Sequence, residues 1–227
     1  MKFFRTDIKR IFTEPSFWLS VFLGAVLLFG GLGYCLASRD GSHLYSQAQA
    51  IALPFAAPLL AAMPYSVMIM TERETKFGAL MILKQSGTER RYRFKRFFTA
   101  GLSGAAALFI PHLALCAVCL VLGETPDASE FAQLILPITF GFGWAAFSYG
   151  LTFVNRQRYV PLVMPQVLYL LCIYAFPYLK LERFYPPLDI APSVSGAVMT
   201  ADCFVLPAVL AVSGLALTAF GKEADEQ

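Results

Sequence analysis

Six long stretches of the chain contain no Asp, Glu, Lys or Arg, and this feature constrains the fold more than any other. They cover residues 16–38, 51–71, 97–123, 131–155, 159–179 and 203–221. An α-helix needs about 20 predominantly apolar residues to cross a hydrocarbon core of about 30 Å. Because 57% of all residues are hydrophobic, we predict an all-α polytopic membrane protein with six transmembrane helices in a single domain. This class excludes a soluble enzyme and a protein that binds nucleic acid.

The distribution of Lys and Arg predicts how these helices are oriented. Fifteen of the 18 Lys and Arg residues lie in the N-terminal tail, in the segments 72–96 and 156–158, or in the C-terminal tail, whereas three lie in the other connecting segments. Connecting segments rich in Lys and Arg stay on the cytoplasmic side of a membrane. We therefore expect both termini in the cytoplasm and the chain in the inner membrane of a bacterial cell.

Residues 1–14 have the pattern of a helix that lies in the membrane interface. Phe4, Ile8 and Ile11 recur at the spacing of one helical face, and most of the cations fall on the other side. A basic amphipathic helix of this kind binds along the lipid headgroups, and Pro15 ends it before the first span. The alternative is a positively charged tail that only orients the first span.

The longest segment that we expect in the cytoplasm is 72–96, which contains eight Lys or Arg and three Glu. Within it, the apolar run 77–83 is flanked by charged residues, which predicts one short helix followed by a turn at Ser86 and Gly87. An apolar helix at a membrane surface needs a partner to cover it. The basic run 90–96 leads into the third span, and contact with anionic lipid alone would also explain its arginines.

Small residues and prolines mark the first and fifth spans. Gly30, Gly31 and Gly33 allow the first span to approach a neighbouring helix closely. Pro161 and Pro165 make the fifth span irregular, and irregular backbone at membrane depth is tolerated only against protein or a water-filled cavity. We predict that these residues line an interface between two copies of the chain, along which a substrate moves. The alternative is that they pack within one chain.

Other glycines and prolines predict local features of the bundle. Gly104, Gly141 and Gly143 favour close packing of the spans that contain them. Prolines within the spans free backbone carbonyls, which neighbouring helices must then bond. The Pro-rich segment 180–202 predicts short helices that dip back into the outer leaflet.

The sequence offers few residues for chemistry in the membrane. The string from Gly101 to Gly104 matches a nucleophile motif around Ser103, but His112 lies about 13.5 Å further along the same helix, beyond reach of the hydroxyl. His112, Cys116 and Cys119 share a helix face, yet a metal site needs further ligands. We predict no catalytic residue, no metal and no cofactor in this chain. Since the spans also lack charges that could hold a coupling ion, transport would need energy from outside the chain.

The order of these parts resembles the membrane (permease) subunit of type-2 ATP-binding-cassette (ABC) exporters over the whole chain: a basic amphipathic helix, a second span ending in Glu72-Arg73-Glu74, a short helix, a basic run and a Pro-containing segment before span six. In that family the loop after span two forms a coupling helix that docks on a separate ATPase. One departure is Ala191-Pro192, where the family often has Asn-Pro.

The resemblance implies a set of docking residues and a set of partners. The docking candidates are Glu72, Arg73, Glu74, Lys76, Phe77, Leu80 and Leu83. The partners are a cytoplasmic ABC ATPase, which holds ATP and magnesium, a second permease chain that forms a homodimer or heterodimer, and membrane lipid. This chain would move an amphiphilic substrate such as a peptide, a lipid or a drug. The alternatives are an accessory or structural membrane protein that transports nothing, a permease of the haem-export type, and an uncoupled channel.

Overall fold

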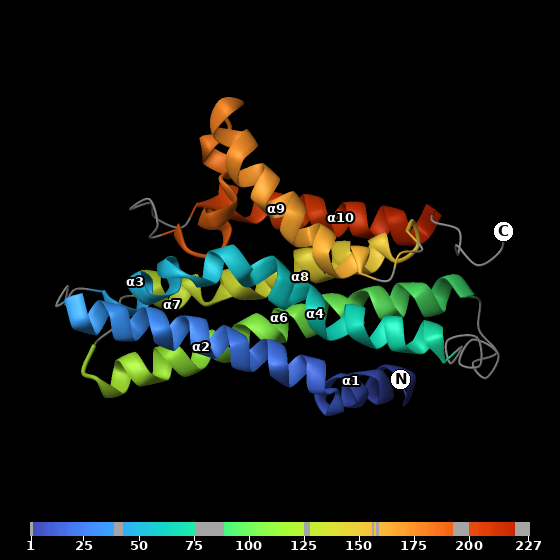
Figure 1. Ribbon diagram of the computed structural model, residues 1–227, viewed down its shortest axis with the longest axis horizontal. Helices are drawn as coiled ribbons and strands as arrows, with labels where there is room; N and C mark the ends of the chain where they lie inside the picture. The colour runs from blue at the N-terminus through green and yellow to red at the C-terminus, as the bar shows by residue number, and fades with distance from the viewer. Residues whose placement is uncertain are drawn as a thin grey trace.

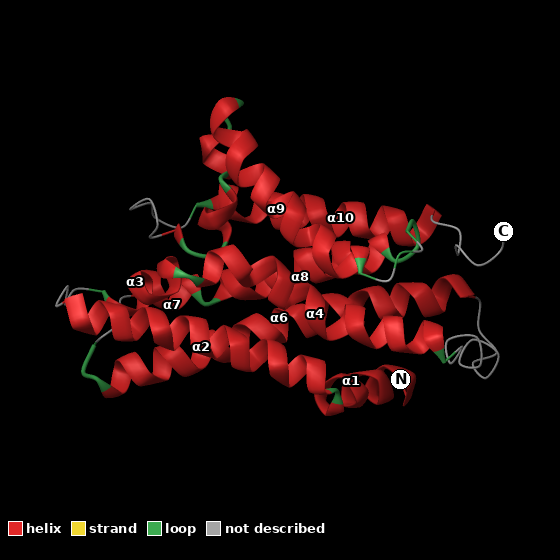
Figure 2. Ribbon diagram, viewed as in Figure 1, coloured by secondary structure: helices red, strands yellow, loops and turns green. Residues whose placement is uncertain are grey.

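The computed structural model describes residues 2–38, 43–75, 89–124, 128–155, 157, 159–192 and 200–220. Over these residues the regular structure is helical throughout, without a strand (Figure 2). Six helical segments are long and apolar enough to cross a membrane: Pro15–Ser38, Leu53–Glu72, Arg91–Val121, Phe131–Leu151, Val160–Tyr178 and Ala201–Phe220. The chain is therefore an all-α polytopic membrane protein, as the charge-free stretches predict.

The long helices form a bundle, and the start of α1 (Lys2–Thr13) and the last turn of the final span lie at the same end of it (Figure 1). The spanning helices are α2 (Pro15–Ser38), α4 (Leu53–Glu74), α6 (Glu89–Val121), α8 (Ile135–Leu151), α9 (Val160–Tyr178) and α10 (Val205–Phe220). Helix α8 packs on α4, α6, α9 and α10 and is central to the bundle. In the most apolar part of the α4 span, 72% of the residues are buried. In that of α9 only 22% are buried, so α9 lies at the periphery.

Glycines bring α8 into backbone contact with its neighbours, as the sequence predicts. A Cβ atom added at Gly141 would lie 2.5 Å from the carbonyl oxygen of Gly104 in α6. One added at Gly150 would lie 2.6 Å from the carbonyl oxygen of Gly214 in α10. Real Cβ atoms do not approach this closely, so any larger residue would push the helices apart. Close backbone approach of this kind stabilises helix pairs in membranes.

Neighbouring helices bond the backbone of α4 around its prolines. Pro64 cannot donate to the carbonyl of Leu60, and the Ser20 hydroxyl of α2 donates to that carbonyl instead, at 2.6 Å. Near Pro58, the Gln166 side chain of α9 accepts from the Leu59 amide at 3.3 Å. It also donates to the Phe55 carbonyl at 2.6 Å. Helices α2 and α9 thus both complete the hydrogen bonding of α4, as expected for proline-containing helices in lipid.

Several element boundaries differ from those read in the sequence. The expected helix at the N-terminus is α1 (Lys2–Thr13), and a further helix, α3 (Leu44–Ile51), precedes α4. The expected fourth span, 131–155, is two helices, α7 (Ala128–Gln133) and α8, because Pro137 has no amide hydrogen to donate to the carbonyl four residues earlier. The basic run that was expected to lead into the third span is itself the first part of α6.

The segment between α9 and α10 contains short helices where the sequence predicts them. These are the 3-10 helices η1 (Glu182–Phe184), η2 (Pro186–Asp189) and η4 (Ala201–Phe204), and they pack on α9, α10 and one another. In Figure 1, α9 slants away from the long axis of the bundle, and this segment returns from its far end towards α10. Ile190 and Ala191 are fully buried. The depth of the segment in a membrane stays a prediction.

Candidate functional site

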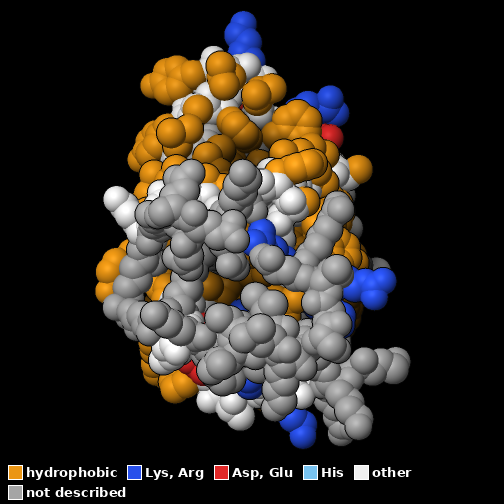
Figure 3. All heavy atoms as spheres, turned by 90° about the vertical axis from the view of Figure 1, so that its right-hand side faces the viewer, with side chains coloured by type: hydrophobic (Ala, Val, Ile, Leu, Met, Phe, Trp, Pro, Cys, Tyr) orange, Lys and Arg blue, Asp and Glu red, His pale blue; other side chains and the backbone are white. Residues whose placement is uncertain are grey.

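The end of the bundle that holds the start of α1 and the end of α10 is rich in cations, and we call it the basic end. There α1, the end of α4, the start of α6 and the end of α10 lie near one another (Figure 1). Figure 3 views this end and shows Lys and Arg side chains among the apolar sides of the bundle. Arg91 and Lys95 are exposed there. The distribution of charge predicts that this end faces the cytoplasm, and this orientation stays a prediction.

Four charged side chains meet inside the basic end, and we call them the Glu72 network: Asp7, Arg10, Glu72 and Arg96. Arg96 binds both carboxylate oxygens of Glu72, with its Nη2 2.7 Å from Oε1 and its Nη1 2.5 Å from Oε2. Arg10 Nη1 donates to Oε1 of Glu72 at 2.7 Å. Asp7 Oδ1 lies 4.0 Å from Arg96 Nη2. One carboxylate therefore holds two arginines from different helices.

The network is buried, which determines what it does for the fold. Asp7 is 1% exposed, Glu72 4% and Arg96 5%. The Tyr65 hydroxyl donates to Asp7 at 3.4 Å. Burial raises the pKa of the Asp7 carboxyl, and the positive charge of Arg96 partly opposes this rise. Because a buried charge without its partner is strongly destabilising, these contacts tie α1, α4 and α6 together at the basic end.

The predicted docking residues differ in how much of them the structure describes. Glu72 directs its carboxylate into the network and cannot offer it to a partner without losing its contacts with Arg10 and Arg96. Arg73 and Glu74 belong to the last turn of α4, and their side chains lie outside the description. The predicted docking helix, with Lys76, Phe77, Leu80 and Leu83, lies outside the described residues. Docking by this segment therefore stays a prediction.

Sequence reading did not single out Asp7 or pair Glu72 with Arg96. A signal for Asp7 was present, because Asp7 lies one helical turn from both Phe4 and Ile11, at the edge of the apolar face of the N-terminal helix. A carboxylate on such a face points towards the membrane or towards a protein partner, and a protein partner is the less costly environment. Nothing local indicated that the partner would be an arginine in another helix.

The predicted interface residues separate into two groups. Gly30 and Gly33 lie on an exposed face of α2, with nothing within 4 Å of an added Cβ atom. An added Cβ at Gly31 would instead collide with the carbonyl oxygen of Ala48 in α3. Pro161 and Pro165 are buried within the chain. Of the five residues, two are therefore open to another molecule, and the interface itself stays a prediction.

Apolar side chains cover the exposed faces of α2 and α9, the two helices whose side chains form hydrogen bonds with the backbone of α4. On α2 these include Phe22 (64% exposed) and Tyr34 (67%). On α9 they include Leu171 (59%) and Tyr174 (70%). Both lipid and a second chain could cover such faces, since both are apolar.

The polar residues in the third span are engaged in helix contacts. The Ser103 hydroxyl donates to the carbonyl of Ala100 at 2.7 Å, within its own helix. His112 is fully buried, with Nδ1 2.8 Å from the carbonyl oxygen of Leu108. Cys116 and Cys119 are buried beside the apolar core. Within the described ranges, no three His, Cys, Asp or Glu residues gather as metal ligands would.

Comparisons with protein-family models, with curated proteins and with solved structures give no match for this chain. The architecture is therefore established by the structure, and the functional assignment rests on the residues described above.

Proposed function

We propose that this chain is the permease subunit of an ATP-driven exporter, which moves an amphiphilic substrate such as a peptide, a lipid or a drug. It is not itself an enzyme. A separate ATPase subunit would bind ATP and magnesium and would dock on the segment 76–88 at the basic end. The observation that carries the proposal is the Glu72 network, which joins the two helices between which that segment runs.

The position of the network in the chain supports the proposal, because its residues lie close to both ends of the proposed docking segment. The segment 76–88 leaves α4 shortly after Glu72 and enters α6 shortly before Arg96. Two charge-assisted contacts link these residues, and such bidentate pairs resist both shear and rotation. A force applied to the segment by a docked subunit would therefore move α4 and α6 together. Arg10 would carry the same displacement to α1 in the membrane interface.

The substrate route proposed here runs along the faces of α2 and α9 between two permease chains. Gly30 and Gly33 are available on the first of these faces. Helix α4 packs against both α2 and α9. The side chains of Ser20 and Gln166 donate hydrogen bonds to its backbone carbonyls. Polar backbone at membrane depth near an open apolar face suits a substrate that has both apolar and polar parts. The proposed location is a bacterial inner membrane, and the charge distribution supports an orientation with the basic end in the cytoplasm.

Affinity purification in mild detergent tests the assembly directly. The tagged chain should co-purify with a protein that carries a Walker motif, and Phe77→Ala should weaken this association by up to a few kcal/mol. Phe98→Ala is the matched control, because Phe98 is an exposed aromatic residue (40%) of α6 near the basic end and lies outside the predicted docking segment. Purification without any ATPase, or equal recovery of ATPase by both variants, would favour the accessory-protein alternative.

A labelling experiment tests the orientation on which docking depends. A cysteine introduced at Lys180, which is exposed near the end of α9, should react with an impermeant thiol reagent added to intact cells. A cysteine at Lys95, exposed at the basic end, should react only after the membrane is opened. The five native cysteines are all buried and give a low background. The reverse pattern would place the basic end outside and exclude a cytoplasmic ATPase at this site.

A further inference from the structure

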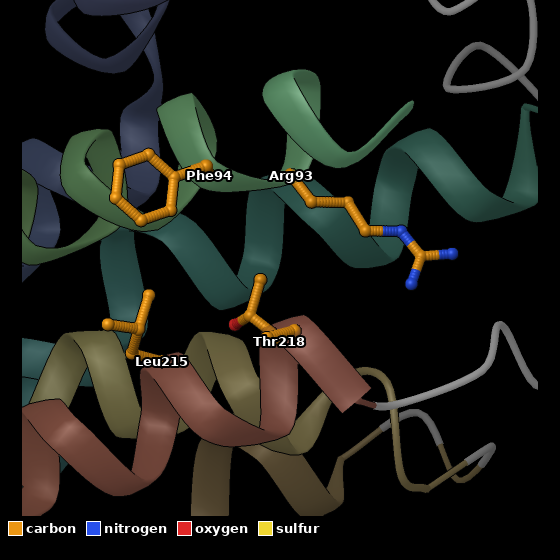
Figure 4. Close-up of a pocket in the computed structure, with 5 residues that line it drawn as sticks. Arg93, Phe94, Leu215 and Thr218 are labelled. Carbon is orange, nitrogen blue, oxygen red and sulfur yellow. The ribbon is translucent and has the colours of Figure 1, made fainter. Parts of the chain in front are cut away.

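The two ends of α10 have different surroundings. At its C-terminal end, α10 and α6 border a cavity of about 180 Å³, which is lined by Arg93, Phe94, Leu215, Thr218 and Ala219 (Figure 4). At its N-terminal end, away from the basic end, η2 and η4 pack on α10. There η2 buries a carboxyl group, that of Asp189, which lies outside both the Glu72 network and the six spans.

Asp189 is shielded from water by its own segment and by the helices on which that segment packs. It is the last residue of η2 and is 1% exposed. Helix η2 packs on α9, α10 and η4. Its neighbours Pro186, Pro187, Ile190 and Ala191 are buried as well. The carboxyl is therefore enclosed by protein at the far end of α9 from the basic end.

Within the described part of the chain, no ion pair compensates this carboxyl. Arg183 of η1 is the only Lys or Arg in residues 181–202. Its side chain is 83% exposed, and its Nε lies 3.5 Å from Oδ2 of Asp202. Among the described residues, Oδ2 of Asp189 also has no hydrogen-bond donor. An ionised carboxylate in these surroundings would lose its hydration and gain no partner, so the neutral form is favoured.

The neighbourhood of Asp189 is aromatic as well as apolar. Tyr169 of α9 is fully buried, and Asp189 and Tyr185 are close enough to act on it electrostatically. The Tyr169 ring lies 5.7 Å from that of Trp144 and 6.0 Å from that of Phe140, measured between centroids. In the described ranges, no three His, Cys, Asp or Glu residues gather as ligands of a metal ion. A proton is the cation that a single enclosed carboxyl can bind.

The other titratable groups around η2 leave Asp189 as the group that responds near neutral pH. Helices α8 and α10 contribute no charged residue. Apart from the exposed Tyr174 and Tyr178, the groups on the remaining neighbours are Tyr169 and Cys172 of α9, Tyr185, and Asp202 and Cys203 of η4. Tyrosine and cysteine ordinarily titrate at higher pH than a carboxyl, and Asp202 is paired with Arg183. Burial raises the pKa of the Asp189 carboxyl to about 9.

We propose that Asp189 is a proton-binding site: it holds a proton while residues 182–191 stay packed on α9 and α10, and it releases that proton when this segment moves away. The step breaks the O–H bond of the carboxyl, and the proton passes to water. Because the carboxylate is hydrated only in the opened state, opening becomes up to about tenfold more favourable for each pH unit above the ordinary pKa of a carboxyl. The proposal is independent of the proposed function, because it requires neither an ATPase nor a second permease chain.

Infrared spectroscopy of the purified chain in mild detergent tests whether the proton is present. At about pH 7, the difference between the spectra of the chain and of Asp189→Asn should contain the C=O stretching band of a protonated carboxyl. The variant should fold, because the amide has the size of the protonated carboxyl and carries no charge. Asp202→Asn is the matched control and should leave this band in place, because Asp202 is paired and partly exposed. If Asp189→Asn leaves the band unchanged, Asp189 is ionised in the folded chain and the proposal is wrong.

Hydrogen exchange of backbone amides, followed by mass spectrometry, tests the link to the segment. The amide of Ala191 donates to the Pro187 carbonyl and that of Leu188 to the Tyr185 carbonyl, both at 2.9 Å, so they exchange when the segment opens. The ratio of the rates in the chain and in Asp189→Asn cancels the intrinsic pH dependence of exchange. This ratio should rise about tenfold per unit between about pH 5 and pH 8.

Two results of the exchange experiment would overturn the proposal. A ratio that stays constant with pH would show that the segment opens without releasing a proton. Exchange of the segment at the same rate as the amides of α8 would show that Asp189 loses its proton only when the whole chain unfolds. Asp189→Leu, which also removes the carboxyl, should give the same difference band and the same ratios as Asp189→Asn.

Discussion

Replacing Arg96 with methionine should destabilise the chain more than any other loss of a single positive charge at the basic end. The substitution leaves Glu72 and Asp7 buried with Arg10 as their remaining cation. Removing one partner of a buried ion pair costs about 3–5 kcal/mol, because the other charge stays buried without compensation. For domains of 150–250 residues, each kcal/mol shifts the unfolding temperature by about 2–4 °C. We therefore expect a decrease of roughly 6–20 °C.

The assay is thermal unfolding of the purified chain in mild detergent, followed by tryptophan fluorescence and by loss of the monodisperse peak in size-exclusion chromatography. Arg91→Met is the matched control, since Arg91 is exposed on the same helix and should shift the unfolding temperature little. A double variant, Glu72→Gln with Arg96→Met, should be more stable than the sum of the two single losses, because it removes both charges of the pair. If Arg96→Met unfolds at the temperature of Arg91→Met, the network does not stabilise the fold.

Three further predictions concern other positions in the bundle, and the unfolding temperature in the same assay tests each of them. Gln166→Leu should cost about 1–2 kcal/mol, because it leaves the carbonyl of Phe55 without its donor from α9; no change would mean that water or the helix itself supplies the bond. Burial raises the pKa of the Asp189 carboxyl to about 9 in the folded chain. The stability that the protonated carboxyl contributes is therefore complete near pH 4. It is lost as the pH rises through 9, by at most about 1.4 kcal/mol per pH unit. Asp189→Asn should flatten this decline, and equal pH profiles would show that the carboxyl is not buried. Gly104→Leu should prevent assembly of the bundle because it collides with backbone, whereas Gly30→Leu should fold normally; the opposite result would reverse the assignment of packed and open faces.

The positions of the spans were predictable because they depend on local composition. A run of about 20 residues without charge must be helical in lipid, since every backbone amide and carbonyl has to be bonded within the chain. The short helix before Pro15 follows from the same kind of local pattern. The break before α8 was also open to prediction, because Pro137 cannot donate to the carbonyl four residues earlier. The absence of charge from 131 to 155 nevertheless favours one continuous span through Pro137.

The contacts at the basic end could not be predicted in this way. The family resemblance implies a docking role for Glu72, and the structure pairs its carboxylate with Arg10, 62 residues earlier, and with Arg96, 24 residues later. No periodicity connects residues at such separations. The bond between Gln166 and the α4 backbone spans 111 residues and joins two helices that are both largely apolar in sequence.

The sequence by itself determined that this chain is a bundle of six membrane-spanning helices, and its charges predict which end faces the cytoplasm. Tertiary structure alone decided which faces of those helices are covered. Gly31 and Gly30 are adjacent in sequence, yet one packs against α3 and the other is open. The physical reason is that the lipid around a membrane protein is as apolar as its interior, so hydrophobicity does not distinguish a buried face from a lipid-facing one. Only the contacts between distant segments make that distinction.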